Sequence, residues 1–149
     1  MRLVVERVNH AFGGVPVLSD IGFTADARVV GVVSGPSGCG KSTLLSISGG
    51  LTRADAGVIR TEGAAPAGCL NPITYVFQDF ALLPWRGVAD NVGFALEHRG
   101  LGAAERAERV ADALRRTGLA DYARALPKQL SGGMRQRVGI ARALAVSPA

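Results

Sequence analysis

The residues from Gly35 to Ser42 have the types and the spacing of a loop that binds phosphate groups. They fit the pattern G-x-x-x-x-G-K-[ST]. Glycines allow the backbone to turn its N–H groups inward around phosphate oxygens, and a helix that starts there adds unpaired donors. Lys41 supplies a positive charge for the β- and γ-phosphates, and the Ser42 hydroxyl is a suitable ligand for Mg²⁺. The sequence therefore predicts a site for a nucleoside triphosphate.

The hydroxyl of Thr43, one residue further along, is expected near the α-phosphate of the same nucleotide. The residues expected to contact the nucleotide are Gly35, Pro36, Ser37, Gly38, Cys39, Gly40, Lys41, Ser42 and Thr43. The loop by itself indicates phosphate binding only, and does not separate a kinase, a GTPase, a motor or a transporter subunit.

A loop of this kind needs a buried strand before it and a helix after it, and the sequence offers both. Residues 29–33 are an apolar run typical of a strand buried on both faces of an α/β sheet, and residues 41–47 are expected to be helical. Further strands are predicted at residues 3–5, 15–18, 21–24, 57–60 and 73–77, with a turn at Ser19 and Asp20 and a loop over residues 61–72.

The second half of the chain is predicted to be helical, over residues 88–97, 103–117 and 132–146. In the middle helix Ala107, Val110, Ala111 and Leu114 fall on one face, which we expect to be buried. Gly118 is expected to end this helix.

Composition limits the classes of protein to which the chain can belong. Its 149 residues are enough for one domain, and 48% of them are hydrophobic. No apolar run approaches the roughly 18–20 residues that span a bilayer, and no signal peptide is evident, so a cytoplasmic location is expected. The net charge of +5 comes from arginines interleaved with acidic residues, so no nucleic-acid partner is expected. Cys39 and Cys69 are expected to stay reduced.

A second segment points to a family. Residues 130–136 read Leu-Ser-Gly-Gly-Met-Arg-Gln, and Arg137-Val-Gly-Ile-Ala-Arg-Ala-Leu follows. Together with the phosphate loop and Gln78, in this order, the segment resembles the signature of the ABC transporter ATPases. The resemblance implies an α/β fold, a P-loop NTPase of ABC type with an N-terminal antiparallel β subdomain and a helical insert.

The resemblance also implies roles for individual residues, with ATP and Mg²⁺ as the cofactors. Ser131 is a good N-cap, and Gly132 and Gly133 open a helix with bare N–H groups. In the family this helix end contacts the γ-phosphate of ATP held by a second subunit, which implies a head-to-tail homodimer.

Two more positions acquire roles from the family. Gln78 corresponds to the glutamine that reaches Mg²⁺ and the attacking water, so Gln78 and Lys41 are the catalytic candidates, and Gln78 and Ser42 the metal ligands. Phe12 corresponds to the aromatic residue that stacks on adenine. The alternative is a phenylalanine that only packs in the core or in a turn.

The segment Leu82, Leu83, Pro84 and Trp85 resembles that of the subgroup that energises nitrate, sulfonate and taurine importers. It is a candidate landing site for a membrane permease subunit, which would place the protein on the inner face of the cell membrane. The alternative is local packing of the insert. Two other classes remain open: an ABC ATPase with no membrane partner, and a nucleotide-binding fragment without hydrolysis.

The family's Asp-Glu pair and switch histidine do not occur in this sequence, so the resemblance implies a fold in which the C-terminal part of the core is missing. The resemblance divides the chain into residues 1–78 with the β subdomain and phosphate loop, 79–133 with the helical insert and signature, and 134–149 returning to the core. We expect these 149 residues to hydrolyse ATP poorly and to expose the apolar runs at 29–33 and 73–77.

Overall fold

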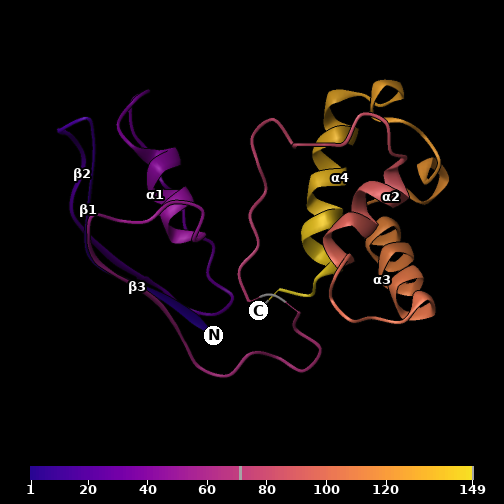
Figure 1. Ribbon diagram of the computed structural model, residues 1–149, viewed down its shortest axis with the longest axis horizontal. Coiled ribbons are helices and arrows are strands. Elements are labelled where there is room, and N and C mark those ends of the chain that lie inside the picture. The colour runs from indigo at the N-terminus through magenta and orange to yellow at the C-terminus, as the bar shows by residue number, and fades with distance from the viewer. Residues whose placement is uncertain (71, 149) are drawn as a thin grey trace. The chain divides into compact units, whose positions relative to one another are not determined.

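The computed structural model describes residues 1–70 and 72–148, and the chain forms two compact units, Met1–Ala65 and Pro66–Ala149. The first unit contains a sheet and one helix, and the second is helical (Figure 1). The division into segments 1–78, 79–133 and 134–149 follows the family resemblance and stays a prediction.

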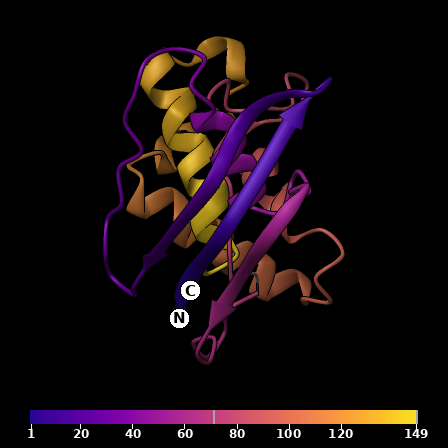
Figure 2. The same ribbon diagram turned by 90° about the vertical axis from the view of Figure 1, so that its left-hand side faces the viewer.

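The first unit is built on a three-stranded antiparallel sheet in the order β2-β1-β3 (Figure 2). Its strands are β1 (Arg2–Phe12), β2 (Val15–Ala25) and β3 (Ala56–Glu62). Gly13 and Gly14 connect β1 to β2 in a two-residue turn with φ values of 56° and 82°, which glycine adopts at little cost. The predicted antiparallel β subdomain is confirmed, because all three strands pair in this sense.

The prediction of a turn at Ser19 and Asp20 is wrong, because β2 continues through both residues. The pairing with β1 shifts register here instead. Asp20 has a φ of 51°, and its N–H donates to Oδ1 of Asn9 at 2.9 Å. The Asn9 side chain therefore replaces the missing ladder hydrogen bond, and the extra residue is absorbed as a bulge.

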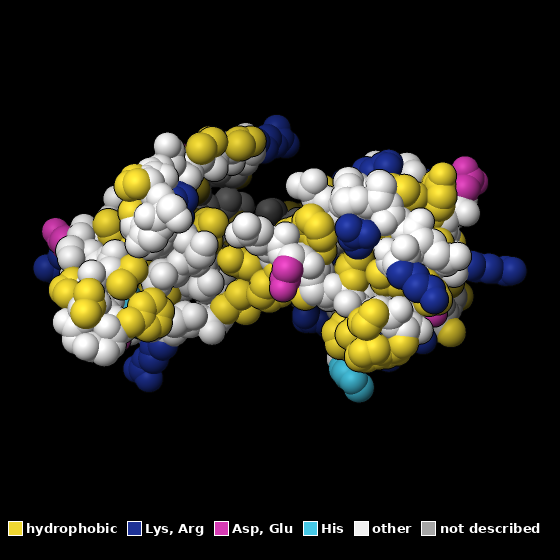
Figure 3. Space-filling model, turned by 90° about the horizontal axis from the view of Figure 1, so that it is seen from above, with side chains coloured by type: hydrophobic (Ala, Val, Ile, Leu, Met, Phe, Trp, Pro, Cys, Tyr) yellow, Lys and Arg dark blue, Asp and Glu magenta, His cyan; other side chains and the backbone are white. Residues whose placement is uncertain are grey.

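The strands predicted at residues 29–33 and 73–77 are also not formed. Both segments are irregular, and Val30 and Val32 are 89% and 84% exposed. A strand forms by hydrogen bonding to a neighbour, and no strand of the described chain pairs with either segment. These valines therefore remain exposed. Figure 3 shows apolar side chains on the face of the molecule that it draws.

The predicted helix after the phosphate loop is confirmed as α1 (Lys41–Ser48). Leu44 and Ile47 are buried on one side of α1, one turn apart. They belong to the core of this unit together with Val5, Val8 and Leu18 of the sheet. This packing attaches the start of α1 to the strands.

The second unit contains the three predicted helical segments. They are α2 (Val88–Gly93), extended by η1 (Phe94–Leu96), then α3 (Ala103–Arg116) and α4 (Gly132–Ala145). Two further 3₁₀ turns, η2 (Ala120–Tyr122) and η3 (Pro127–Gln129), connect α3 to α4. The fully buried core consists of Val88, Val92, Leu96, Ala113, Leu114, Leu119, Leu130, Val138, Ala141, Ala145 and Val146.

The buried face of α3 differs in part from the predicted one. Leu114 is buried and Val110 is half-buried, but Ala107 and Ala111 are exposed, and Ala113 is buried in their place. The methyl groups of Ala107 and Ala111 are too short to fill the space beside α2, so a groove remains there. Gly118 ends the helix as predicted, with a φ of 66°. Within the two described ranges, no helix has the length and apolarity needed to cross a bilayer.

Replacing Leu119, which is fully buried, with alanine is expected to lower the free energy of unfolding by about 2–5 kcal/mol, because it leaves a cavity in the core. Trp85→Ala is the control, since Trp85 is 73% exposed and its loss should change the free energy by less than about 0.5 kcal/mol. Urea unfolding followed by circular dichroism measures both. Equal effects of the two substitutions would contradict this core.

Candidate nucleotide-binding site

The phosphate loop lies exposed immediately before α1. Nζ of Lys41 donates to the carbonyl oxygens of Gly35 and Pro36 at 3.0 and 2.7 Å, so the ammonium group lies over the loop that it follows. Gly40 is the N-cap of α1 and has no side chain to cap the helix, and no acidic residue lies in the first turn. The site therefore combines a positive charge with helix N–H groups that are free to receive an anion.

Gly40 is required by the geometry of the loop. Its φ is 91°, and a Cβ atom there would lie 2.9 Å from the carbonyl oxygen of Val17 and 3.0 Å from Cδ2 of Leu18. Any other residue would clash with β2, whose backbone cannot easily move within the sheet. The loop is thus pressed directly against β2, which sets its position.

Phe12 lies at the hairpin that joins β1 to β2, close along β2 to Val17, which the phosphate loop approaches. It pairs with Val15 and is 56% exposed. The His10 ring packs against Phe12 edge-on, with 4.7 Å between centroids. Phe12 is therefore held beside the start of β2, the strand that also positions the phosphate loop, and it is exposed enough for a base to reach it.

Two side chains that no sequence motif indicated, His10 and Asp55, support this aromatic position. His10 is 8% exposed, and its Nδ1 lies 3.4 Å from Oδ1 of Asp55. The other carboxylate oxygen of Asp55 accepts a hydrogen bond from the N–H of Ala11 at 2.7 Å. Asp55, which directly precedes β3, thus contacts Ala11 and His10 near the end of β1, next to Phe12.

The residues of the loop fit a magnesium ion that arrives with a nucleotide. Mg²⁺ keeps several waters and takes phosphate oxygens, so it needs only one or two protein oxygens. Ser42 offers a hydroxyl in the exposed first turn of α1. Among the described residues, no group of three or more His, Cys, Asp or Glu side chains is placed to hold a metal.

The signature segment forms the start of α4 in the second unit. Oγ of Ser131 accepts a hydrogen bond from the N–H of Met134 at 3.3 Å, so the predicted N-cap is confirmed. Ser131, Gly132 and Gly133 are exposed. The first turn of α4 therefore presents backbone donors to the surface without a side chain over them.

Gln78 is exposed at the start of a turn over residues 78–81, in the second unit. Phe80 and Ala81 have φ values of 62° and 42°, which are unfavourable for residues with a side chain. The turn lies against α4, because a Cβ atom on Gly139 would be 3.4 Å from Val76 and 3.9 Å from Phe80. The structure thus brings Gln78 next to the helix that carries the signature.

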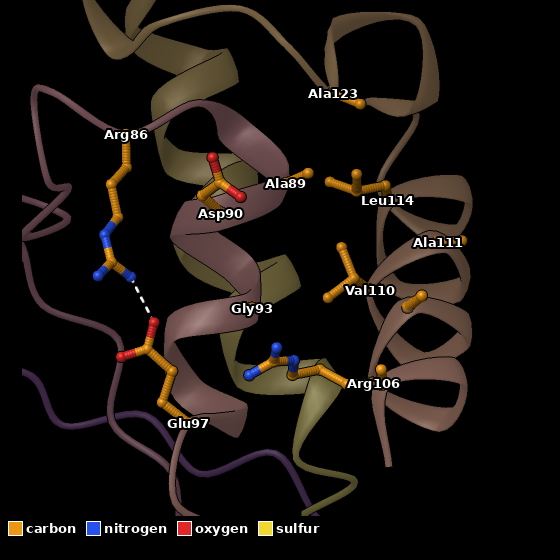
Figure 4. A pocket seen from close by; sticks show the side chains of 12 residues that line it. Arg86, Ala89, Asp90, Gly93, Glu97, Arg106, Val110, Ala111, Leu114 and Ala123 are labelled. Atoms are coloured by element: carbon orange, nitrogen blue, oxygen red, sulfur yellow. Dashed lines mark hydrogen bonds and ion pairs between the residues drawn. The ribbon is translucent and has the colours of Figure 1, made fainter. Parts of the chain in front are cut away.

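The segment Leu82, Leu83, Pro84 and Trp85 is divided between core and surface. Leu82 packs partly against the core, whereas Trp85 is 73% exposed. Beside it, a groove of about 600 Å³ runs between α2 and α3 (Figure 4). Val110 and Leu114 form its apolar wall, and Arg86, paired with Glu97, lies at its edge.

Comparison with known proteins places these features in a family. The sequence model of the ABC transporter family matches residues 18–149. The taurine import ATP-binding protein TauB of Pseudomonas aeruginosa PAO1 is 51% identical over 117 residues, which are 78% of this chain and 44% of that protein. TauB of Escherichia coli O157:H7 is 45% identical over 146 residues, 98% of this chain and 57% of that protein. The chain thus spans about half the length of these relatives.

A solved structure shares the fold. It is described as a dimeric post-hydrolysis state of the ATP-binding cassette MJ0796 bound to ADP and Pi, and it superimposes with a TM-score of 0.75 at 29% identity. The match covers 98% of this chain and 70% of that one. This agreement confirms the predicted P-loop NTPase fold of ABC type. By the family match over residues 18–149 and by this fold, the chain belongs to the ABC transporter family.

Proposed function

We propose that this chain is the ATP-binding part of an ABC importer subunit of the sulfonate and taurine type. The observation that carries the proposal is the exposed phosphate loop. It lies against β2 at Gly40, it precedes a helix N-terminus without a side-chain cap, and the Lys41 ammonium group bonds to its backbone. Two TauB proteins with 45% and 51% identity support the subgroup.

In this proposal the loop N–H groups and the start of α1 bind the phosphates, and Lys41 leaves its two carbonyl acceptors for the β- and γ-phosphate oxygens. Phe12, which is exposed, stacks on the adenine ring. Ser42 and, by the family resemblance, Gln78 would be the ligands of Mg²⁺, which would neutralise negative charge on the phosphates. The exposed amide of Gln78 also orients the attacking water.

The first turn of α4 completes the site of a second copy. Its exposed N–H groups suit the γ-phosphate of an ATP molecule bound to the partner, so two copies associate head-to-tail around two nucleotides. The structural relative is itself described as a dimer with ADP and Pi.

A permease subunit is the proposed membrane partner. Trp85 offers a large exposed apolar surface, and the adjoining groove has an apolar wall with charged residues at its edge. These features fit an amphipathic helix of a permease. The protein would then work on the cytoplasmic face of the membrane, where ATP is available.

Lys41→Ala is expected to weaken ATP binding about tenfold to a hundredfold, because it removes a charge-assisted hydrogen bond to phosphate. Lys128→Ala is the matched control, since Lys128 is the only other lysine and lies exposed in η3. Calorimetric titration with ATP measures both dissociation constants. Equal affinities for the two variants would refute the phosphate site.

Phe12→Ala is expected to weaken ATP binding about fivefold, corresponding to the loss of one aromatic stack of about 1 kcal/mol. Its affinity for inorganic triphosphate should not change, because that ligand has no base, and Phe12→Tyr should bind ATP normally. An equal loss of affinity for both ligands would show that Phe12 supports the fold instead.

Trp85→Ala in the full-length protein is expected to reduce copurification with its permease, since it removes most of the exposed apolar surface of the segment. Its ATP affinity should stay within twofold of the wild type by calorimetry, an outcome that excludes misfolding. Copurification at the wild-type level would contradict this docking surface and favour an ABC ATPase without a membrane partner.

A further inference from the structure

The turn that follows Gln78 contains backbone strain that its own residues do not explain. Phe80 and Ala81 both have positive φ values, 62° and 42°, and neither is Gly, Asn or Asp. Consecutive residues in this region persist only where the surrounding structure holds them. The turn has one backbone hydrogen bond of its own, from the N–H of Phe80 to the carbonyl of Phe77 at 3.1 Å.

Arg142, on the signature helix α4, supplies part of this restraint. Its Nη1 donates to the carbonyl oxygen of Ala81 at 2.9 Å. Its Nε and Nη2 donate to the backbone oxygen and to Oδ1 of Asn91, at 3.1 and 3.0 Å. The planar fork of a guanidinium group can serve these three neutral oxygens at once, which a lysine ammonium cannot do with the same fixed geometry.

The environment of Arg142 is unusual for a charged side chain. Burial lowers the pKa of its guanidinium group from the ordinary value, and the oxygens that it contacts carry no formal charge. Arginine nevertheless stays protonated in proteins. A half-buried charge bonded only to neutral oxygens therefore marks a position where the directional donors of a guanidinium group are used.

Asn91 connects the same cluster to the residues that follow the turn. It is fully buried, and its Oδ1 accepts from the N–H of Leu83 at 2.8 Å. Its Nδ2 lies within 3.1 Å of the carbonyl oxygens of Leu83, Arg86 and Gly87. A single side chain thus satisfies backbone groups along the irregular segment 83–87, which has no secondary structure to pair them.

We infer that Asn91 and Arg142 are positioning residues that hold the Gln78 turn and the segment carrying Trp85 in a fixed relation to the signature helix. The inference rests on the proposed ATP-driven function. A displacement of α4 would move the carbonyl of Ala81 and the backbone of Asn91 with it. Gly139 supports this coupling, because its missing side chain lets α4 approach Val76 and Phe80 closely.

The competing interpretation is that the cluster only stabilises the helical unit. The two interpretations differ in what the loss of Arg142 does. A stabilising role predicts a general loss of structure. A positioning role predicts a local release of residues 79–87 and a loss of turnover, while ATP still binds to the first unit.

The test uses the full-length protein with its permease, comparing Arg142→Ala with Arg137→Ala. Arg137→Ala is the control, because Arg137 also lies on α4 and donates to backbone carbonyls. Its acceptors belong to Thr117 and Gly118, which are not part of the Gln78 turn. We expect Arg142→Ala to lower kcat about tenfold to a hundredfold with KM for ATP unchanged. Hydrogen exchange should accelerate in residues 79–87 and not in α3, and Arg137→Ala should change neither.

Asn91→Ala should reproduce this pattern, and the double variant should lose less activity than the product of the two single effects, because both residues serve one network. If Arg142→Ala does not fold, Arg142→Lys is measured in the same way, and the same direction of change is expected. Unchanged kcat and exchange in the folded variant, or independent effects of the two substitutions, would overturn the inference.

The proposed function fails separately, because it predicts that Lys41→Ala lowers kcat/KM for ATP at least about tenfold through lost affinity. If Lys41→Ala hydrolyses limiting ATP at the wild-type rate, the proposed function is wrong. If Lys41→Ala shows this loss and Arg142→Ala behaves like Arg137→Ala, only the positioning role is wrong.

Discussion

The contact between Gly40 and the carbonyl of Val17 sets the geometry of the first unit. It places the phosphate loop directly against β2 and leaves the start of α1 open for an anion. The same strand begins beside Phe12, so one hairpin positions both the proposed base platform and the phosphate loop. Leu44 and Ile47 complete the arrangement, because they bury α1 in the same core as that hairpin.

The second unit is subject to a different constraint. Its Gln78 turn and the segment after it have irregular backbone beside a buried helical core. Buried backbone N–H and carbonyl groups need partners, and no sheet supplies them here. Asn91 and Arg142 supply them from α2 and α4. A consequence is that the helix beginning at the signature and the turn beginning at Gln78 share hydrogen bonds.

The differences between the expected and observed elements have a common cause. Helices close their hydrogen bonds within one segment, so α1, α3 and α4 were predictable from local pattern within a residue or two. Strands need partners elsewhere, so the apolar runs at residues 29–33 and 73–77 were typical of strands but did not form them. The bulge at Asp20 depended on the side chain of Asn9, which no local pattern reveals.

The sequence by itself determined the chemistry: the phosphate-binding pattern, the lysine and hydroxyl that go with it, the N-cap of the signature helix and the membership of a family. These features lie within short segments, where residue type and spacing are sufficient. Only the tertiary structure decided that Gly40 lies directly against β2, that Asp55 reaches His10, and that Arg142 reaches Ala81. Each of those contacts joins residues distant along the chain or on separate elements, so packing had to bring them together.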